Sequence, residues 1–181
     1  MPGPPRLSWS VILLDLPKAP ELLDLLVVRL RAYLAARQIS APLLIGIHSG
    51  GAWLAERLGS ALGLQEAPGL LDIRFYRDDY SQSGLHTGAR PSRLPSAIDG
   101  RHVILVDDIL YSGRTIRAAL NELFDYGRPA SVSLAVLISR DGRELPIQAD
   151  CCALELSLPR TQVIKLRGPE PLHLELVERH A

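Results

Sequence analysis

Residues 102–115, with the sequence HVILVDDILYSGRT, constrain the fold of this 181-residue chain more than any other segment. The β-branched and apolar residues 103–106 predict a buried strand, and two adjacent carboxylates, Asp107 and Asp108, follow it. A short loop of small and hydroxyl residues comes next, and a helical pattern starts at Arg114. A strand that leads into a helix through a tight loop is the building unit of a parallel α/β sheet, in which ligands bind beyond the carboxyl ends of the strands.

The same order of residues suits a phosphorylated sugar. The first amides of the helix have no intrahelical partner and lie at the positive end of the helix dipole, so they favour a phosphate. Asp107 and Asp108 precede this turn and can accept hydrogen bonds from sugar hydroxyls. A second interpretation treats them as a helix cap and a solvated acid. Two carboxylates at the end of so apolar a strand nevertheless cost desolvation energy unless a ligand or a metal pairs with them.

Strand and helix patterns alternate along the rest of the chain, which predicts an α/β fold: a parallel sheet flanked by helices. Predicted strands cover residues 11–14, 43–47, 72–76, 103–106, 131–138, 163–166 and 172–176, and predicted helices cover residues 21–38, 52–62 and 114–126. Gly46 predicts a close backbone approach, Gly50 and Gly51 predict a turn, and Phe124 is expected to face inward. With 47% apolar and 22% charged residues, the chain suits one domain, residues 1–181.

Residues 102–115 resemble the 5-phosphoribosyl diphosphate (PRPP) motif of type I phosphoribosyltransferases. They are more narrowly similar to the PyrR family, pyrimidine operon regulators that also act as uracil phosphoribosyltransferases. The aspartate pair, the tyrosine before a hydroxyl residue and the Gly-Arg-Thr ending fit this narrower group. Two further segments agree: residues 75–79, FYRDD, resemble the segment before the family's flexible loop, and residues 143–150, RELPIQAD, resemble its hood segment.

The resemblance implies a type I phosphoribosyltransferase fold with a flexible loop at about 77–100 and a small hood at about 139–160. It implies an enzyme that converts uracil and PRPP to UMP and pyrophosphate, with Asp107 and Asp108 as the catalytic residues that hold the ribose hydroxyls. Mg²⁺ is the implied cofactor, held mainly by PRPP and not directly by the protein. The PRPP-binding residues implied by the resemblance are Val106, Asp107, Asp108, Ile109, Leu110, Tyr111, Ser112, Gly113, Arg114 and Thr115.

The loop implied to bind pyrophosphate contains His48, Ser49, Gly50 and Gly51. The family places lysine, threonine and arginine where His48, Ser49 and Gly50 stand, so a charge-assisted contact to the leaving group is missing. Such a loss weakens transition-state stabilisation by about 2–4 kcal/mol. We therefore keep slow catalysis, or binding without catalysis, as an alternative, and expect an arginine at position 50 to raise turnover. A plain strand-to-helix turn is the remaining interpretation.

Arg77 and Arg140 are the further substrate contacts that the resemblance implies. For Arg77, a surface ion pair with a neighbouring aspartate is the alternative. Main-chain groups of the hood and Arg140 are expected to read the uracil edge. The family has an aspartate where Ser139 stands, and an aromatic residue, valine and glycine where residues 151–153 read Cys-Cys-Ala. These departures leave the nucleobase open, with a purine or orotate as alternatives.

Composition excludes several other classes of protein. Lysine plus arginine equals aspartate plus glutamate at 20 each, so no global charge attracts nucleic acid. No apolar run is long enough to span a bilayer and the N-terminus lacks a secretory signal, so we expect no membrane association. The neighbouring Cys151 and Cys152 indicate buried, free thiols in a reducing cytoplasm.

A second function remains open: a regulator that senses UMP or PRPP and binds RNA with little or no turnover. Its candidate basic residues are Arg29, Arg31 and Arg37, with Lys18 nearby, and they lie at mixed angles on one predicted helix. The family commonly forms dimers or tetramers, so a homo-oligomer is expected. We expect apolar residues 22–26 to be exposed, which is compatible with such an assembly.

Overall fold

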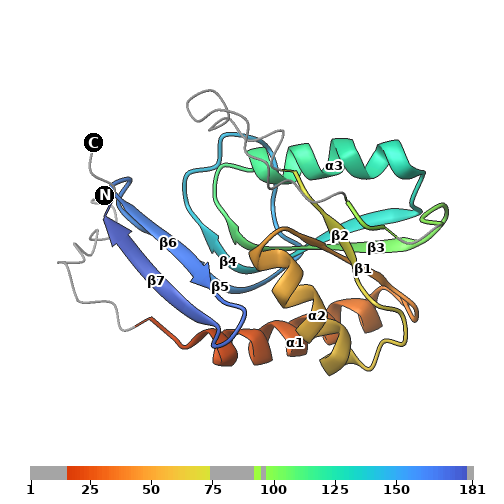
Figure 1. The fold of residues 1–181 in the computed structure, drawn as a ribbon, viewed down its shortest axis with the longest axis horizontal. Coiled ribbons are helices and arrows are strands. Elements are labelled where there is room, and N and C mark those ends of the chain that lie inside the picture. The colour runs from red at the N-terminus through yellow and green to blue at the C-terminus, as the bar shows by residue number, and fades with distance from the viewer. Residues whose placement is uncertain (1–15, 74–91, 95–96, 179–181) are drawn as a thin grey trace, which may run out of the picture.

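The computed structural model describes residues 16–73, 92–94 and 97–178, and its main feature is a five-stranded parallel sheet of order β2-β1-β3-β4-β5. The sheet is covered by helices on both faces, as the ribbon shows (Figure 1). The elements are α1 (Ala19–Ala36), β1 (Leu43–Ile47), α2 (Gly50–Leu62), β2 (Gly69–Leu71), β3 (His102–Leu110), α3 (Arg114–Tyr126), β4 (Ser131–Arg140), β5 (Cys151–Leu156), β6 (Gln162–Arg167) and β7 (His173–Glu178).

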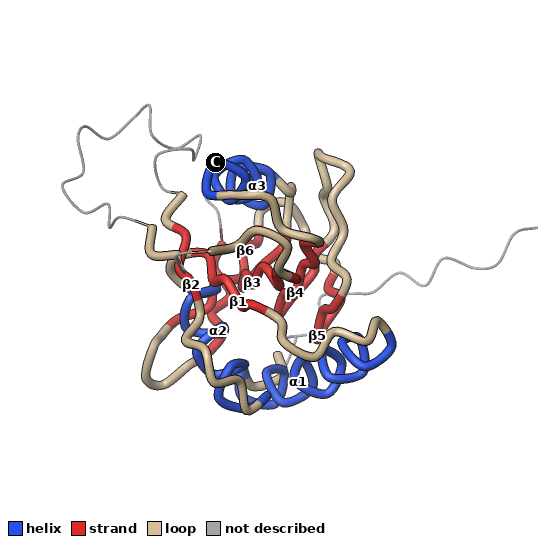
Figure 2. The backbone as a smooth tube through the Cα atoms, turned by 90° about the vertical axis from the view of Figure 1, so that its right-hand side faces the viewer, coloured by secondary structure: helices blue, strands red, loops and turns tan. Residues whose placement is uncertain are grey.

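The core lies on both faces of the sheet. In Figure 2, α1 and α2 lie on one side of the strands and α3 lies on the other. Leu26, Leu30 and Leu54 fill the first face, and Ile116 and Leu123 fill the second. All five residues of β1 are buried, because a strand covered on both faces needs apolar side chains in both directions. The predicted α/β fold is therefore confirmed.

The first turn of α2 packs directly on the sheet because three positions have no side chain. A Cβ atom at Gly46 would lie 2.6 Å from the carbonyl oxygen of Gly51, and one at Gly51 would collide with the carbonyl oxygen of Val106. The predicted close approach at Gly46 is thus confirmed. Gly50 and Gly51 are the first residues of α2 and not a separate turn, because His48 and Ser49 already form the turn that follows β1.

Two predicted strand boundaries were wrong, and strand pairing explains both. β3 does not stop at Val106: it continues through the two aspartates to Leu110, because Ile109 and Leu110 still pair with β4. β2 covers residues 69–71; of the strand predicted at 72–76, residues 72 and 73 are not part of a strand, and residues 74–76 lie outside the described residues. Beyond it, the amide of Asp72 donates to the Ser92 hydroxyl at 3.1 Å, and residue 70 forms an antiparallel bridge with Arg93. The predicted strand at residues 11–14 lies outside the described residues.

The fifth strand of the sheet, β5, was not predicted. Its neighbouring Cys151 and Cys152 are free thiols, and Cys151 is buried as expected whereas Cys152 is only partly buried. Phe124, expected to face inward, is 41% exposed. Leu22 and Leu26 are buried against the sheet, so only Leu25 of the apolar run at 22–26 is exposed. A membrane-crossing helix would need more length and apolarity than any helix of the described segments has.

A separate antiparallel hairpin, β6 and β7, stands at one end of the molecule in Figure 1. Its inward side chains Ile164 and Leu166 are buried in the same cluster as α1 and α2, and β6 contacts the end of β3. The segment set apart from the main sheet is therefore residues 162–178. Residues 151–156, inside the predicted hood of about 139–160, pair with β4 as the fifth strand of the main sheet.

Candidate functional site

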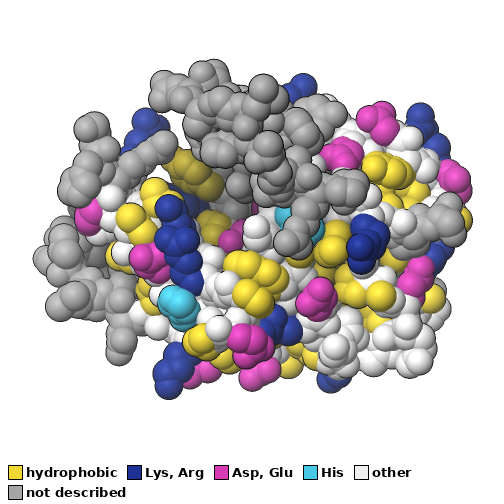
Figure 3. Space-filling view, in the orientation of Figure 1, with side chains coloured by type: hydrophobic (Ala, Val, Ile, Leu, Met, Phe, Trp, Pro, Cys, Tyr) yellow, Lys and Arg dark blue, Asp and Glu magenta, His cyan; other side chains and the backbone are white. Residues whose placement is uncertain are grey.

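A cavity of about 390 Å³ lies where β1 and β3 end and where the hairpin approaches them. Three parts of the chain form its walls: the loop after β1 with the start of α2, the end of β3 with the start of α3, and the strand β6. The lining residues are His48, Ser49, Gly50, Trp53, Asp107, Asp108, Ile109, Thr115, Ile164, Lys165, Leu166 and Arg167. The space-filling view shows a hollow beside the hairpin, with basic, acidic and hydrophobic side chains around it (Figure 3).

The two aspartates both line this cavity. Asp107 is 4% exposed, and Asp108 is half-buried. The side chain of Asp108 lies over Gly50: a Cβ atom built at Gly50 would be 2.5 Å from Oδ2 and 2.6 Å from Cγ of Asp108. The absence of a side chain at position 50 therefore makes the space that the Asp108 carboxylate occupies.

The turn between β3 and α3 presents the first amides of a helix beside the aspartates. Gly113 is the residue before the helix and has φ of +92°, a left-handed conformation that disfavours other side chains. The Ser112 hydroxyl accepts a hydrogen bond from the amide of Arg114 at 3.3 Å. Thr115 lines the cavity from the first turn of α3. The arrangement combines amides, a hydroxyl and the positive end of a helix dipole, which together favour an anion.

Several of the sequence-predicted residues shape this turn and do not line the first cavity. Val106 and Leu110 are buried in β3, and the Nε atom of Arg114 donates to Glu144 at 2.6 Å in an exposed ion pair. Tyr111 packs against Gly142, where a Cβ atom would collide with its ring. Arg77 lies outside the described residues, as do residues 77–91 of the predicted loop.

Arg143 holds the turn in place, a role that the sequence did not reveal. Its Nη1 atom donates to the carbonyl oxygens of Leu110 at 3.1 Å and Arg140 at 2.9 Å, and also to that of Tyr111. Its Nε atom donates to the carbonyl oxygen of Ile147 at 3.0 Å. Burial lowers the pKa of this guanidinium from its ordinary value. One side chain thus ties the end of β3 to the segment that follows β4.

Arg140, the predicted contact to the base, lines a cavity beside Tyr111 and is itself held by main-chain carbonyl oxygens. It is 4% exposed, and its Nη atoms donate to the carbonyl oxygens of Gln162 at 2.7 Å and Leu158 at 3.2 Å. Its guanidinium lies 4.4 Å from the centre of the Tyr111 ring. The Nη groups are therefore committed to main-chain carbonyls, whereas the buried Nε atom of Arg140 has no hydrogen-bond partner among the described residues.

A second cavity, of about 420 Å³, adjoins the first. The two share Ile109, Ile164 and Lys165, so they form neighbouring subsites on either side of these residues. Tyr111, Arg140 and Arg160 line the second cavity and not the first. Neighbouring subsites of these sizes are what a phosphorylated sugar and a flat base joined to it require.

Oxygen donors are available for a hard cation, but they do not form a cage. Among the residues that the structure describes, no group of three or more histidine, cysteine, aspartate and glutamate side chains converges on one point. Asp107 and Asp108 supply carboxylate oxygens, the ligand type that Mg²⁺ prefers. They fit a metal ion whose remaining ligands come from a bound phosphate compound and water.

The adjacent cysteines offer no nucleophile. Burial raises the pKa of the Cys151 thiol to about 11, and it also raises the pKa of Cys152. Both groups are therefore neutral thiols at pH 7, and the thiolate is the reactive form. The expectation that Cys151 and Cys152 are structural agrees with this chemistry.

Comparisons with known proteins agree with the geometry. The model of the phosphoribosyl transferase domain family matches residues 21–162. The bifunctional protein PyrR of Pseudomonas aeruginosa strain PAO1 is 57% identical over 162 residues, which cover 90% of this chain and 95% of that protein. The bifunctional protein PyrR of Pseudomonas fluorescens is 53% identical over 163 residues, which cover 90% and 97%.

Solved structures show the same fold at lower sequence identity. The hypoxanthine phosphoribosyltransferase of Trypanosoma cruzi has a TM-score of 0.60 with 22% identity over 78% of this chain and 80% of that one. A hypoxanthine-guanine-xanthine phosphoribosyltransferase has a TM-score of 0.58 with 20% identity over 81% and 79%. From the family model, the relatives and the fold together, this chain belongs to the PyrR family within the type I phosphoribosyltransferases.

Proposed function

We propose that this phosphoribosyltransferase transfers the phosphoribosyl group of PRPP to uracil and forms UMP and pyrophosphate. Family membership gives the class of enzyme, and the PyrR relatives support the pyrimidine. The observation that carries the proposal is that Asp107 and Asp108 share one cavity with the loop after β1 and the start of α3. A pentose with a phosphate at one end and a diphosphate at the other needs those three groups around it.

The sugar phosphate is held at two ends in this proposal. The amides and hydroxyls of residues 112–115 bind the 5′-phosphate, where the helix dipole favours the dianion. Asp107 and Asp108 accept hydrogen bonds from the ribose hydroxyls. The diphosphate extends toward residues 48–51, whose amides lie at the start of a second helix, α2. Both charged ends of the substrate therefore meet a helix N-terminus.

In the reaction, a ring nitrogen of the base forms a bond to C1 of the ribose while the bond from C1 to the diphosphate oxygen breaks. The base loses its N–H proton, and the electron pair of the broken bond leaves with pyrophosphate. Positive charge develops on the sugar ring, and the aspartate carboxylates stabilise it electrostatically. Mg²⁺, when bound with PRPP, neutralises part of the diphosphate charge, and the oxygens of Asp107 and Asp108 fit it. Most of the catalysis is positioning.

The base lies in the second cavity in this proposal. Because the Nη atoms of Arg140 already donate to carbonyl oxygens, we assign it a positioning role: it fixes Tyr111 and the start of β6. The base is then read by main-chain groups and by the walls at Ile109 and Tyr111. A larger purine or the charged orotate is the alternative that a panel of bases tests.

RNA binding is the second function that the family resemblance leaves open. The predicted basic helix is α1, and its arginine side chains already contact other groups of this chain. Arg29 donates to the carbonyl oxygen of Cys152 at 2.5 Å, and Arg31 donates to that of Ala61. Arg37 stacks over the Tyr33 ring at 4.8 Å. An RNA-binding role therefore draws no support from this helix.

The test is to mix the protein with PRPP, Mg²⁺ and labelled uracil and to measure UMP. We expect a nucleotide product with uracil, which is UMP, and no nucleotide product with hypoxanthine, guanine or orotate. Thermal unfolding with PRPP or UMP provides the second readout, because a ligand that binds only the folded state raises the melting temperature. Stabilisation by UMP without turnover would favour the regulatory alternative, and turnover with another base would overturn the assignment of uracil.

A further inference from the structure

We propose that Lys165 of β6 binds the diphosphate of PRPP and stabilises the departing pyrophosphate, in place of the cations that residues 48–50 lack. The inference rests on the proposed function and adds to it a residue from the hairpin. Lys165 is exposed on β6 and lines the cavity together with residues 48–50. Sequence reasoning missed it because it lies more than 110 positions along the chain from that loop. The sequence distinguishes Lys165 in one way, because only Lys18 and Lys165 are lysines among the 20 basic residues.

The first step of the argument is charge. A diphosphate carries several negative charges, yet the cavity is lined by two carboxylates, Asp107 and Asp108. The loop that faces them contributes histidine, serine and glycine and no lysine or arginine. Two cations line the cavity instead, Lys165 and Arg167, and both come from β6. The positive charge that lines this cavity therefore comes from β6 and not from the loop.

The second step separates these two cations. Lys165 lies directly opposite Glu175 in the hairpin, a register in which opposite charges usually pair. Glu175 instead accepts a hydrogen bond from the Nε atom of Arg167 at 2.6 Å. Lys165 makes no hydrogen bond or ion pair with any residue in the parts of the chain that the structure describes. The charge of Arg167 is offset by Glu175, and the ammonium group of Lys165 remains available.

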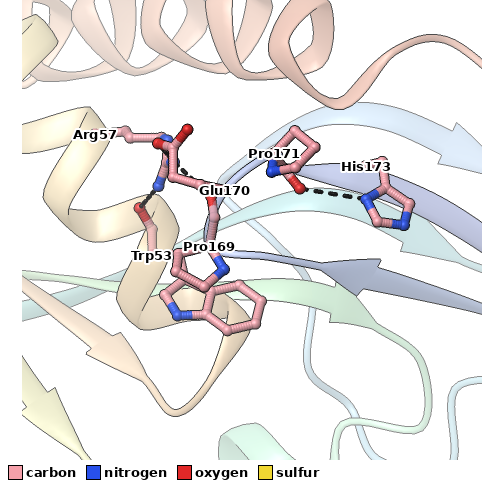
Figure 4. A network of polar contacts seen from close by, with 6 residues as sticks. All are labelled: Trp53, Arg57, Pro169, Glu170, Pro171 and His173. Atoms are coloured by element: carbon pink, nitrogen blue, oxygen red, sulfur yellow. Dashed lines mark hydrogen bonds and ion pairs between the residues drawn. The ribbon is translucent and has the colours of Figure 1, made fainter.

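The third step is that the hairpin is anchored to the helix that begins at the loop. Arg57 of α2 donates from Nη2 to the carbonyl oxygen of Pro169 at 2.7 Å and to Glu170 at 2.8 Å (Figure 4). Gly168 packs against Trp53: a Cβ atom there would lie 3.0 Å from Cε3 of the indole. Because α2 starts at Gly50, this anchor sets the distance between β6 and residues 48–50.

Lys165 also lines the second cavity, so a contact with a base carbonyl is the competing role. The charge of the ligand favours the diphosphate over the base carbonyl as the partner of Lys165. A diphosphate is an anion that rewards a cation, whereas uracil is neutral. A lysine that merely extends into solvent is the third possibility, and the experiment separates all three.

The experiment is chemical labelling of lysine side chains, which is simple to interpret because the sequence has two lysines. The full-length protein is acetylated with an amine-reactive ester, and mass spectrometry gives the labelling rate of Lys165 with Lys18, an exposed residue before α1, as the internal control. We expect PRPP, or inorganic pyrophosphate with Mg²⁺, to slow labelling of Lys165 about fivefold or more, in the way that a buried ion pair shields an amine, and to leave Lys18 unchanged. Uracil alone is expected to have no effect.

Other labelling results overturn the proposal. Protection by uracil alone and not by pyrophosphate assigns Lys165 to the base. Absence of any protection, while PRPP still raises the melting temperature and UMP still forms, shows a solvated lysine and leaves the proposed function standing. If PRPP neither stabilises the protein nor supports UMP formation, the proposed function fails and this inference fails with it.

Kinetics provide the second arm. We expect Lys165→Met to lower kcat/KM for PRPP and the rate of the reverse reaction of UMP with pyrophosphate by about tenfold to a hundredfold, the range for a hydrogen bond to a charged group. The KM for uracil should stay within about twofold, within the error of such measurements. Lys165→Arg should recover most of the loss, and Lys18→Met should behave as the unaltered protein. Equal losses in the Lys18→Met and Lys165→Met variants would overturn the proposal.

Discussion

The carboxylate of Asp108 occupies the space directly above Gly50, and a Cβ atom at Gly50 would lie 2.5 Å from its Oδ2 atom. The first residue of α2 and the last acid of the β3 doublet are thus fitted to each other. From the sequence, Gly50 was a position that had lost an arginine. In the structure, it is also the position that allows Asp108 to line the cavity.

This relationship reverses our expectation for position 50. Gly50→Arg has to displace the Asp108 side chain, so we now expect the arginine to lower kcat/KM for PRPP instead of raising turnover. Gly50→Ala should show the same effect with no added charge, by about tenfold, because one misplaced carboxylate costs catalysis on that scale. Steady-state kinetics with varied PRPP measure it.

Gly59→Ala is the matched control, because a Cβ atom there meets only ordinary contacts at 3.6 Å or more within the same helix. It should leave activity unchanged and stabilise the fold by up to about 1 kcal/mol, as alanine does relative to glycine in a helix. A Gly50→Arg variant that turns over faster than the unaltered protein would restore the sequence-based expectation.

The aspartate doublet should be essential for PRPP and unimportant for folding. We expect Asp107→Asn and Asp108→Asn each to lower kcat/KM for PRPP by about a hundredfold, the loss seen when a preorganised electrostatic group is removed. The melting temperature without ligand should change little, because asparagine has the size of aspartate and keeps an oxygen that accepts hydrogen bonds. Asp125→Asn on the exposed end of α3 is the control. Unchanged kinetics in the Asp107 and Asp108 variants would remove the basis of the proposed function.

Arg143 should matter more to stability than a surface arginine does. Arg143→Ala removes a donor from the part-buried carbonyl oxygens of Leu110 and Ile147, and a polar group left unsatisfied in the interior costs about 1–3 kcal/mol. Arg143→Lys should not restore the loss, since an ammonium group lacks the planar fork that reaches several acceptors. Urea unfolding gives the free energies.

Arg114→Ala is the matched comparison for stability, because the ion pair of Arg114 with Glu144 is exposed, and an exposed pair contributes at most about 1 kcal/mol. We expect the two alanine variants to differ clearly. Equal free energies of unfolding would show that the contacts of Arg143 do not hold the turn.

The thiol of Cys151 should give a pH dependence of known sign. Its pKa is raised from 9.0 to about 11 in the folded state, so folding favours the protonated thiol. The resulting stabilisation is fully present below pH 9 and is lost as the pH rises from 9 toward 11. We expect the unfolding free energy to fall over this window and to fall less steeply in Cys151→Ala. At pH 8, native Cys151 should react with a disulfide reagent far more slowly than it does in urea; equal rates would contradict the raised pKa.

The local sequence pattern was enough to predict the elements whose ends are marked by residues next to them in the chain. The strand at residues 43–47 and the helix at residues 114–126 were predicted with the bounds the structure has, because an uninterrupted apolar run and flanking glycines mark their ends. The aspartate doublet and the helix start behind it were read as a site for the same reason: all their residues are neighbours in the chain. The family followed from these motifs.

Tertiary structure alone decided the features that join distant parts of the chain. β5 exists as a strand because β4 offers it a partner, and its own residues carry no strand alternation. Three features join segments at least 32 residues apart: the fit of Asp108 to Gly50, the bonds of Arg143 to the end of β3, and the cavity that Lys165 lines together with residues 48–50. Packing chooses such neighbours, because burial and hydrogen bonding depend on which surfaces meet and not on the order in which residues follow one another.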